Sequence, residues 1–365
     1  MPKASGDTSP RTFAKKNLPC YPTPEKPQFL MPIIETSTRP LVYKRDRSSI
    51  SLGDALDNYC RWEPPTVIIS DGPYGLSSYP GDPPTPRDLG EVYRPHARAW
   101  AEYSLPSTTL WFWNSELGWA TAHPTLEQEG WEYRSCHIWD KGIAHAAGNS
   151  NTKTLRKFPV VTEVCVQYTR KVSFASDNRQ MTMQEWLRHE WQRSGLPLYM
   201  TNEACGVKNA ATRKYFTQCH LWYFPPADAF AALSEYANKH GVPTGRPYFS
   251  LDGLKPISKS QWEGMRAKFY CSNGITNVWQ EGAVRGVERI KNLYKCLHMN
   301  QKPLRLLELT IKASSDKDDV VWEPFGGLCS ASIAAHKLGR RSFAAEVNAD
   351  YFDIAKRRLE NYDVF

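Results

Sequence analysis

The sequence predicts an α/β protein in which a mainly parallel β-sheet is flanked by helices and interrupted by an inserted module. Short β-branched and aromatic runs alternate with longer segments in residues 41–172 and again after residue 300. This alternation is typical of strands joined by crossover connections. Residues 173–290 lose the alternation and gain basic side chains, which indicates a separate or inserted region. The chain has 365 residues, 41% of them apolar, which is enough for a sizeable core.

The first part of the chain divides into an arm and four predicted strands. Residues 1–40 are rich in Pro, Ser, Thr and Lys without periodicity, so we expect an irregular arm. In residues 41–172, we expect four parallel strands, at Thr66–Ser70, Thr109–Trp113, Trp131–Trp139 and Val160–Val166. Five prolines between Leu76 and Pro95 predict a long loop, which at this length is usually functional or mobile.

Residues 291–365 return to the α/β pattern. The expected order is a helix, a strand, a helix, a strand and a last helix. Their bounds are Lys302 to about Ala313, Asp319–Trp322, Ser332–Gly339, Ser342–Glu346 and Tyr351–Glu360. The last helix carries basic residues near its end, where the helix dipole favours positive charge.

Charge points to a polyanionic partner. The net charge is +8, and residues 171–300 hold 17 basic against 10 acidic residues. The chain also contains 13 tryptophans, and basic and aromatic side chains together suit a surface that handles phosphates and bases. Residues 173–290 are therefore the candidate region for contact with such a partner. Candidate contacts are Arg213, Lys214, Arg246, Lys255, Lys259, Arg266, Lys268 and Arg285.

Other patterns exclude several classes of protein. No apolar run approaches 18 residues and the N-terminus lacks the charged-then-apolar pattern of a signal peptide, so we expect neither a membrane span nor secretion. Nine cysteines without a Cys-x-x-Cys pair argue against a disulfide framework and for a cytoplasmic protein with reduced thiols. Cys219 and His220 are adjacent and have no second pair at ligand spacing, so the sequence predicts no metal site.

One candidate site follows the first predicted strand. Asp71, Gly72, Pro73 and Tyr74 stand at its carboxyl end, where ligands bind in open α/β sheets. An aspartate there can accept hydrogen bonds from an amine, and Pro73 holds Gly72 extended so that its carbonyl offers a second acceptor. Tyr74 supplies a ring on which a base can stack. The same tetrapeptide is also compatible with an ordinary turn capped by aspartate.

A second candidate site spans the last two strands. Glu323-Pro324-Phe325-Gly326-Gly327 follows one strand, and Glu346 ends the next, 19 residues after Gly327. Small residues at such a turn let a ligand approach the backbone, and an acid about 20 residues on accepts hydrogen bonds from ribose hydroxyls. This spacing indicates a nucleotide-like cofactor.

Together these motifs resemble the DNA amino-methyltransferases. The family's catalytic signature is Asp/Asn/Ser-Pro-Pro-aromatic, and its cofactor signature is Asp-Pro-Phe-x-Gly-x-Gly. Further resemblances are Gly53-Asp54-Ala55-Leu56, Trp139-Asp140-Lys141, Glu163, Asn277-Val278-Trp279 and Gln301-Lys302-Pro303-Leu304. The catalytic half precedes the basic region and the cofactor half, which is the order of the family's β class. Gly72 replaces the first proline, Glu323 replaces the aspartate, and Cys329 replaces the second glycine of the cofactor turn.

The resemblance implies a Rossmann-like methyltransferase sheet that uses S-adenosylmethionine. Its domains are the catalytic half (41–172), a target-recognition region (173–290) and the cofactor half (291–365). It implies that Asp71, Gly72, Pro73 and Tyr74 catalyse the reaction. The implied cofactor residues are Glu323, Pro324, Phe325, Gly326, Gly327, Glu346, Lys302 and Asp71.

The implied reaction is methylation of the N6 amine of adenine in duplex DNA, with the base flipped out of the helix. An opening aspartate favours adenine, and the N4 amine of cytosine is the alternative. An RNA or protein methyltransferase and an inactive DNA-binding protein are the rival interpretations. Bacterial or phage origin, a cognate restriction endonuclease, and a monomer or homodimer are implied by the resemblance alone.

Overall fold

The computed structural model describes residues 41–77, 82–146, 153–176, 179–219, 221–292, 295–296 and 301–361. The expected N-terminal arm, part of the predicted loop and His220 lie outside these residues. None of the helices in the described part is both long and apolar enough to span a membrane.

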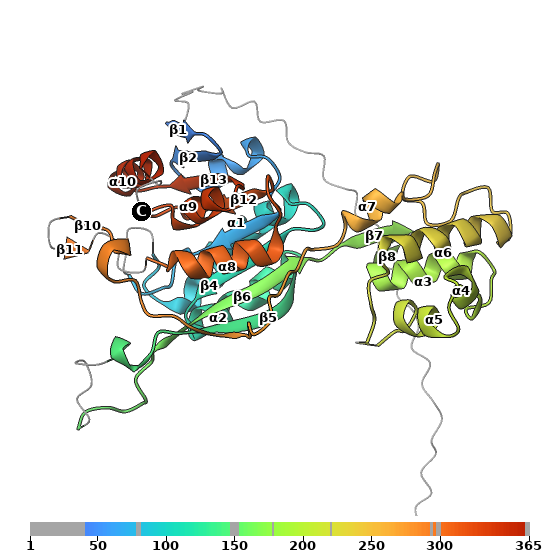
Figure 1. Cartoon of the computed structure of the whole chain (residues 1–365), viewed down its shortest axis with the longest axis horizontal. Helices are drawn as coiled ribbons and strands as arrows, with labels where there is room; N and C mark the ends of the chain where they lie inside the picture. Colours follow the sequence, from blue (N-terminus) through green and yellow to red (C-terminus); the bar gives the residue numbers. More distant parts are fainter. Residues whose placement is uncertain are drawn as a thin grey trace, which may run out of the picture. The chain divides into compact units, whose positions relative to one another are not determined.

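In the described residues, one sheet of nine strands organises most of the chain (Figure 1). Its order is β1-β2-β13-β12-β3-β4-β6-β5-β9. The bounds are β1 (Val42–Arg45), β2 (Ser48–Leu52), β3 (Val67–Ser70), β4 (Thr109–Asn114), β5 (Trp131–Asp140), β6 (Thr162–Arg170), β9 (Val278–Gln280), β12 (Val320–Glu323) and β13 (Arg341–Glu346). Adjacent strands from β2 to β4 are parallel, which confirms the predicted α/β class.

The predicted parallel direction of the fourth strand is wrong. β6 lies between β4 and β5 and is antiparallel to both. A parallel pair needs a crossover connection, usually a helix. Between β5 and β6 the described residues contain only the short 3-10 turn η4 (Ile143–His145), so these two strands form a long hairpin.

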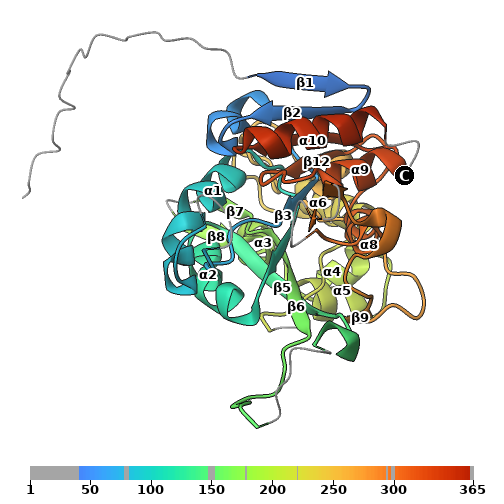
Figure 2. The same ribbon diagram turned by 90° about the vertical axis from the view of Figure 1, so that its left-hand side faces the viewer.

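Helices cover both faces of the sheet (Figure 2). α1 (Leu89–Tyr103) and α2 (Glu116–Gln128) pack on one face, together with the 3-10 turns η1 (Ala55–Asp57) and η2 (Tyr59–Arg61). α8 (Leu304–Ser314), α9 (Ser330–Lys337) and α10 (Ala349–Glu360) pack on the other. The predicted loop up to Pro95 ends earlier than expected. The 3-10 turn η3 (Pro86–Asp88) leads directly into α1, which contains Pro95.

The inserted region folds around its own core. It begins with the hairpin β7 (Ser173–Ser176) and β8 (Arg179–Thr182), followed by α3 (Met183–Arg193), α4 (Met200–Ala204), α5 (Ala210–Tyr215), α6 (Ala227–His240) and α7 (Lys259–Glu263). Trp186, Trp191, Phe230 and Trp262 are buried in this core. We call residues 173–263 the helical module. Beyond it, β9 pairs with β5, so the end of the predicted target-recognition region belongs to the main sheet. A short hairpin of β10 (Lys291–Asn292) and β11 (Lys295–Cys296) follows, after the 3-10 turn η5 (Gly286–Glu288).

The strand register defines two edges of the sheet. Ser70 pairs with Phe112, Asn114 with Val164, and Asp140 with Thr162. The carboxyl ends of β3, β4 and β5 and the start of β6 therefore lie at one edge, which we call the carboxyl edge. At the opposite, amino edge, Thr109 pairs with Thr169 and Trp131 with Arg170.

Candidate active site

A buried ionic network lies at the carboxyl edge. Asp71 directly follows β3, and its Oδ1 accepts hydrogen bonds from Lys302 Nζ at 2.7 Å and from the Tyr74 hydroxyl at 3.1 Å. The Tyr74 hydroxyl is also 3.1 Å from Glu163 Oε2, and Lys302 Nζ is 3.3 Å from the same oxygen. Lys141 pairs with Glu163. Two carboxylates and two ammonium groups thus balance each other's charge beside β3.

Burial and charge act in opposite directions on the groups of this network. Burial raises the pKa of Asp71, although the Lys302 ammonium opposes that rise. Burial would also raise the pKa of Glu163, but Lys302 and Lys141 outweigh it and lower the pKa. Burial disfavours charge on Lys302, yet Asp71 and Glu163 raise its pKa. Since its side chain is only 1% exposed, the charge of Lys302 depends on these two carboxylates.

The backbone after Asp71 is fixed by side chains from α1 and β4. The Pro73 carbonyl accepts from the Tyr93 hydroxyl at 3.0 Å and from Asn114 Nδ2 at 2.9 Å. A Cβ on Gly72 would lie 2.6 Å from the Phe325 ring and 2.7 Å from the Tyr93 hydroxyl oxygen. The glycine in place of the family's proline therefore has a physical reason, because no side chain fits between these two rings.

Asp82 holds the next turn of the chain. Its Oδ1 accepts from the backbone N–H groups of Tyr74 at 2.9 Å and Gly75 at 2.7 Å, and its Oδ2 from that of Leu76 at 3.0 Å. Three backbone donors on one carboxylate fix the loop that follows the tetrapeptide.

The predicted cofactor turn connects β12 to α9. Glu323 ends β12, and its carboxylate accepts from the backbone N–H groups of Ala331 and Ser332, each at 2.8 Å. Burial raises the pKa of Glu323 to about 7. Cys329 adopts φ 54°, in the left-handed region that favours glycine, which explains why the family has glycine here.

Glu346 closes this turn from the end of β13. Its Oε2 accepts from the Gly327 N–H at 2.6 Å, and its Oε1 from the Asn348 N–H at 2.8 Å. A Cβ on Gly326 would lie 2.9 Å from the Ala345 carbonyl oxygen, so the turn packs directly against β13. Burial raises the pKa of Glu346, and these backbone donors oppose the rise.

Most of the predicted residues line one cavity of about 410 Å³. The predicted catalytic tetrapeptide and the predicted cofactor turn, which are about 250 residues apart in the sequence, both line this cavity. The predicted residues that line it are Asp71, Gly72, Pro73, Tyr74, Pro324, Phe325, Gly327 and Glu346. Lys302, Glu323 and Gly326 line a small neighbouring cavity that also includes Asp71.

The predicted DNA contacts fall in different places. Arg213 and Lys214 are exposed on α5, and Lys255 is exposed in the turn before α7. Arg246 pairs with the buried Glu190, Lys259 with Asp228, and Arg266 with Glu263. Lys268 pairs with Asp316 and Asp319, and Arg285 donates to the Ala144 carbonyl at 3.3 Å.

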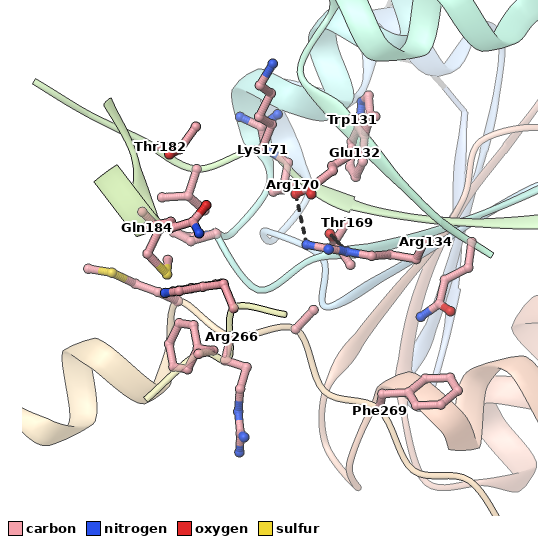
Figure 3. Close-up of a pocket in the computed structure, with 18 of the residues that line it drawn as sticks. Trp131, Glu132, Arg134, Thr169, Arg170, Lys171, Thr182, Gln184, Arg266 and Phe269 are labelled. Carbon is pink, nitrogen blue, oxygen red and sulfur yellow. Dashed lines mark hydrogen bonds and ion pairs between the residues drawn. The ribbon is translucent and has the colours of Figure 1, made fainter. Parts of the chain in front are cut away.

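A second cavity of about 760 Å³ lies at the amino edge, beside the helical module. Trp131, Arg134 and Arg170 from β5 and β6 face Gln184 and Arg266 across it (Figure 3). Several of its cations have partners within the protein. Arg134 pairs with Glu132, and Arg170 donates to the Gly130 carbonyl.

Sequence reasoning missed three residues that hold the site. Tyr93, Asp82 and Asn114 fix the backbone around Pro73 and Tyr74. Asn114 ends a predicted strand at the edge where ligands bind, and that position was a usable signal. Asp82 and Tyr93 carry no comparable signal. Their hydrogen bonds to the backbone of residues 73–76 depend on how the chain folds back towards the end of β3.

Comparisons with known proteins identify the family to which the chain belongs. The profile of the N6/N4 DNA methylase family matches residues 66–357, and the chain belongs to this family. Its members are S-adenosylmethionine-dependent DNA methyltransferases of the adenine-N6 or cytosine-N4 type.

Particular relatives match parts of the chain. Type II methyltransferase M.ScaI of Streptomyces caespitosus is 35% identical over 179 residues, which is 47% of this chain and 53% of that protein. Type II methyltransferase M1.MboII of Moraxella bovis is 32% identical over 122 residues, 32% of this chain and 47% of that protein. The chain thus spans about half the length of these relatives. The crystal structure of the M1.HpyAVI–SAM complex aligns over 86% of this chain and 98% of that one, with 16% identity and a TM-score of 0.45.

Proposed function

We propose that this chain transfers a methyl group from S-adenosylmethionine to the exocyclic amine of a base in duplex DNA. We further propose N6 of adenine as the target, with N4 of cytosine as the alternative. The observation that carries this proposal is the shared 410 Å³ cavity, in which Asp71 and Glu346 belong to one site. The opening aspartate of the tetrapeptide supports adenine.

The residues of this cavity fit the methyl donor. Four carboxylates line it, from Asp54, Asp71, Asp82 and Glu346, and no Lys or Arg stands among the described lining residues. Such a lining favours a cationic ligand and disfavours a phosphate. When bound, S-adenosylmethionine supplies an electrophilic methyl group on a positively charged sulfur. Glu346 would hold the ribose hydroxyls, and Phe325 and Tyr351 offer apolar faces beside them.

Asp71 is arranged to accept a hydrogen bond from the target amine. Lys302 and Tyr74 both donate to its Oδ1, and no described residue donates to its Oδ2. The Pro73 carbonyl is already occupied, whereas no described side chain donates to the Gly72 carbonyl. We propose that Asp71 Oδ2 and the Gly72 carbonyl accept the two amine hydrogens. The nitrogen lone pair is then localised away from the ring and directed at the methyl carbon.

The depth of this site supports base extrusion. Asp71 lies in a cavity, and Tyr74 is only 6% exposed, so an amine paired inside a duplex cannot reach them. We propose that the target base leaves the helix and packs against Tyr74. Positioning and electrostatics then supply most of the rate enhancement, without a covalent enzyme intermediate.

The test is methylation of mixed-sequence duplex DNA in the presence of S-adenosylmethionine, followed by digestion to nucleosides and mass spectrometry. We expect N6-methyldeoxyadenosine with the unchanged protein and none with Asp71→Ala. Asp353→Ala, which removes an exposed carboxylate on α10, is the matched control and should retain activity.

Thermal stabilisation by the cofactor separates loss of binding from loss of chemistry. Turnover by Asp71→Ala would refute the assigned role. N4-methyldeoxycytidine as the product would change the target base. Methylation of RNA alone would refute duplex DNA as the substrate.

A further inference from the structure

Resting on this proposed function, we propose that the connection between β5 and β6 holds the DNA backbone beside the target base. We call its described residues, 141–146 and 153–161, the edge arm. The chemical partner is duplex DNA, contacted through its phosphates by the arm's cations and through its bases by an exposed phenylalanine. On this inference the helical module, which the sequence favours as the DNA-binding region, does not make the contact nearest the site.

The position of the edge arm follows from the strand register. Asp140 ends β5 and pairs with Thr162, which begins β6, at the carboxyl edge. Asp71, which follows β3, stands at the same edge. The arm therefore leaves the sheet beside the proposed active site, and Figure 1 shows this connection extending away from the sheet at the end opposite the helical module.

The helical module leaves the sheet at the other edge. It follows Arg170, the last residue of β6, which pairs with Trp131 at the amino edge. From Glu163 to Arg170 the strand advances about 23 Å at roughly 3.3 Å per residue. Lys268, on the chain returning from the module, lies 2.7 Å from Asp319, the residue before β12. Asp319 is also at the amino edge, so both connections of the module lie far from Asp71.

The composition of the edge arm suits DNA. Residues 141–161 contain Lys141, Lys153, Arg156 and Lys157, and no aspartate or glutamate. All eight residues from 153 to 160 are exposed. An acid-free, basic and exposed segment attracts phosphates and releases counterions from DNA.

Exposed apolar side chains in the same arm point to contact with bases. Phe158 is 94% exposed and Ile143 is 79% exposed. Leaving such side chains in water is unfavourable, and DNA-binding proteins insert apolar residues of this kind against or between base steps. Because Arg156 and Lys157 directly precede Phe158 on the same exposed stretch, the chemistry fits a nucleic acid better than an apolar protein surface.

Two contacts connect the edge arm to the rest of the carboxyl edge. Arg285 donates to the Ala144 carbonyl at 3.3 Å, so one of the sequence-predicted DNA contacts belongs beside this arm. Lys141, at the base of the arm, pairs with Glu163, which the Tyr74 hydroxyl contacts at 3.1 Å. DNA held by the arm would therefore lie next to the network that contains Asp71.

The test compares two pairs of adjacent basic residues, all four of which are exposed. Arg156→Ala/Lys157→Ala removes the pair in the edge arm, and Arg213→Ala/Lys214→Ala removes a pair on α5 of the helical module. The full chain is titrated with fluorescent duplex DNA at several salt concentrations by anisotropy. Phe158→Ala is measured in the same way.

We expect the arm pair to weaken DNA binding at least tenfold and to reduce the salt slope by about 2, since each phosphate contact contributes about 1. The module pair should stay within about twofold of the unchanged protein. Thermal stabilisation by S-adenosylmethionine should remain unchanged in all variants, and the KM for DNA should rise with kcat maintained in the arm pair. Phe158→Ala should weaken binding without changing the salt slope.

Unchanged DNA binding by the arm pair would overturn the inference, and so would an equal or larger loss in the module pair. The anisotropy titration measures DNA binding independently of methyl transfer. If the unchanged protein binds DNA through the arm but methylates no nucleic acid, the proposed function fails, and only the contact between the arm and DNA holds.

Discussion

Gly72→Ala tests the packing argument for the glycine in the catalytic tetrapeptide. A new Cβ would lie 2.6 Å from two carbons of the Phe325 ring, where ordinary carbon contacts are about 3.5–4.0 Å. Phe325 cannot withdraw freely, because its ring centroid lies 4.9 Å from that of His96 and 5.8 Å from that of Tyr93. Overpacking of this kind costs about 1–3 kcal/mol.

Two effects of opposite sign act on the stability of the Gly72→Ala protein. Gly72 does not have a positive φ, so without the clash alanine would stabilise the protein by about 0.4–1 kcal/mol through the unfolded state. Taking both effects together, we expect the free energy of unfolding to fall by about 1–2 kcal/mol. Gly282→Ala is the matched control, since nothing lies within 4 Å of its added Cβ and its φ is also not positive.

Urea unfolding of the two variants and of Gly72→Ala/Phe325→Leu measures the effect. We expect the double variant to recover part of the lost stability, because the shorter side chain leaves room for the Cβ. A Gly72→Ala protein as stable as the Gly282→Ala control would refute the reasoning.

Two further predictions concern titrating groups. Lys302→Met removes the ammonium that opposes the raised pKa of Asp71, so the acid limb of the profile of kcat/KM against pH should move to higher pH; an unmoved limb would show that Asp71 is not the group observed. Glu323 has a pKa of about 7 against an ordinary 4.5, so the folded state binds its proton more tightly. The contribution of the Glu323 carboxyl group to the free energy of unfolding should be full below about pH 4.5. It should fall by at most about 3 kcal/mol as the pH rises through 7. Glu323→Gln should remove this fall between pH 5 and 8 in urea unfolding, and an identical fall in the variant would contradict the assignment.

Element positions could be predicted well where local pattern decides them. β12 and β13 lie within about a residue of their predicted bounds. For β12, two adjacent valines followed by a turn with two glycines allow little else. The direction of β6 was predicted wrongly because six consecutive residues of this antiparallel strand are buried, a pattern more typical of a parallel strand covered on both faces. The helix α1 was missed because Pro95 normally breaks a helix, whereas here the helix continues through it.

The sequence identified residues of the candidate site but not the contacts between their side chains. The motif spacing identified Asp71 and Glu346, which do line one cavity. The family resemblance implies that Lys302 contacts the cofactor. In the structure its ammonium lies 2.7 Å from Asp71 Oδ1, a contact between residues 231 positions apart. Side-chain pairing of this kind depends on the register of the folded sheet, which local patterns do not contain.

The place of β12 has a consequence for how the protein is made. This strand lies between β13 and β3, in the interior of the sheet, yet it comes from the last fifth of the described chain. As the chain emerges from the ribosome, the backbone edges of β2 and β3 that later pair with β13 and β12 stay unsatisfied until residues 320–346 have been synthesised. Unpaired strand edges readily join other chains, so the nascent protein is vulnerable to aggregation until residues 320–346 have been added and paired.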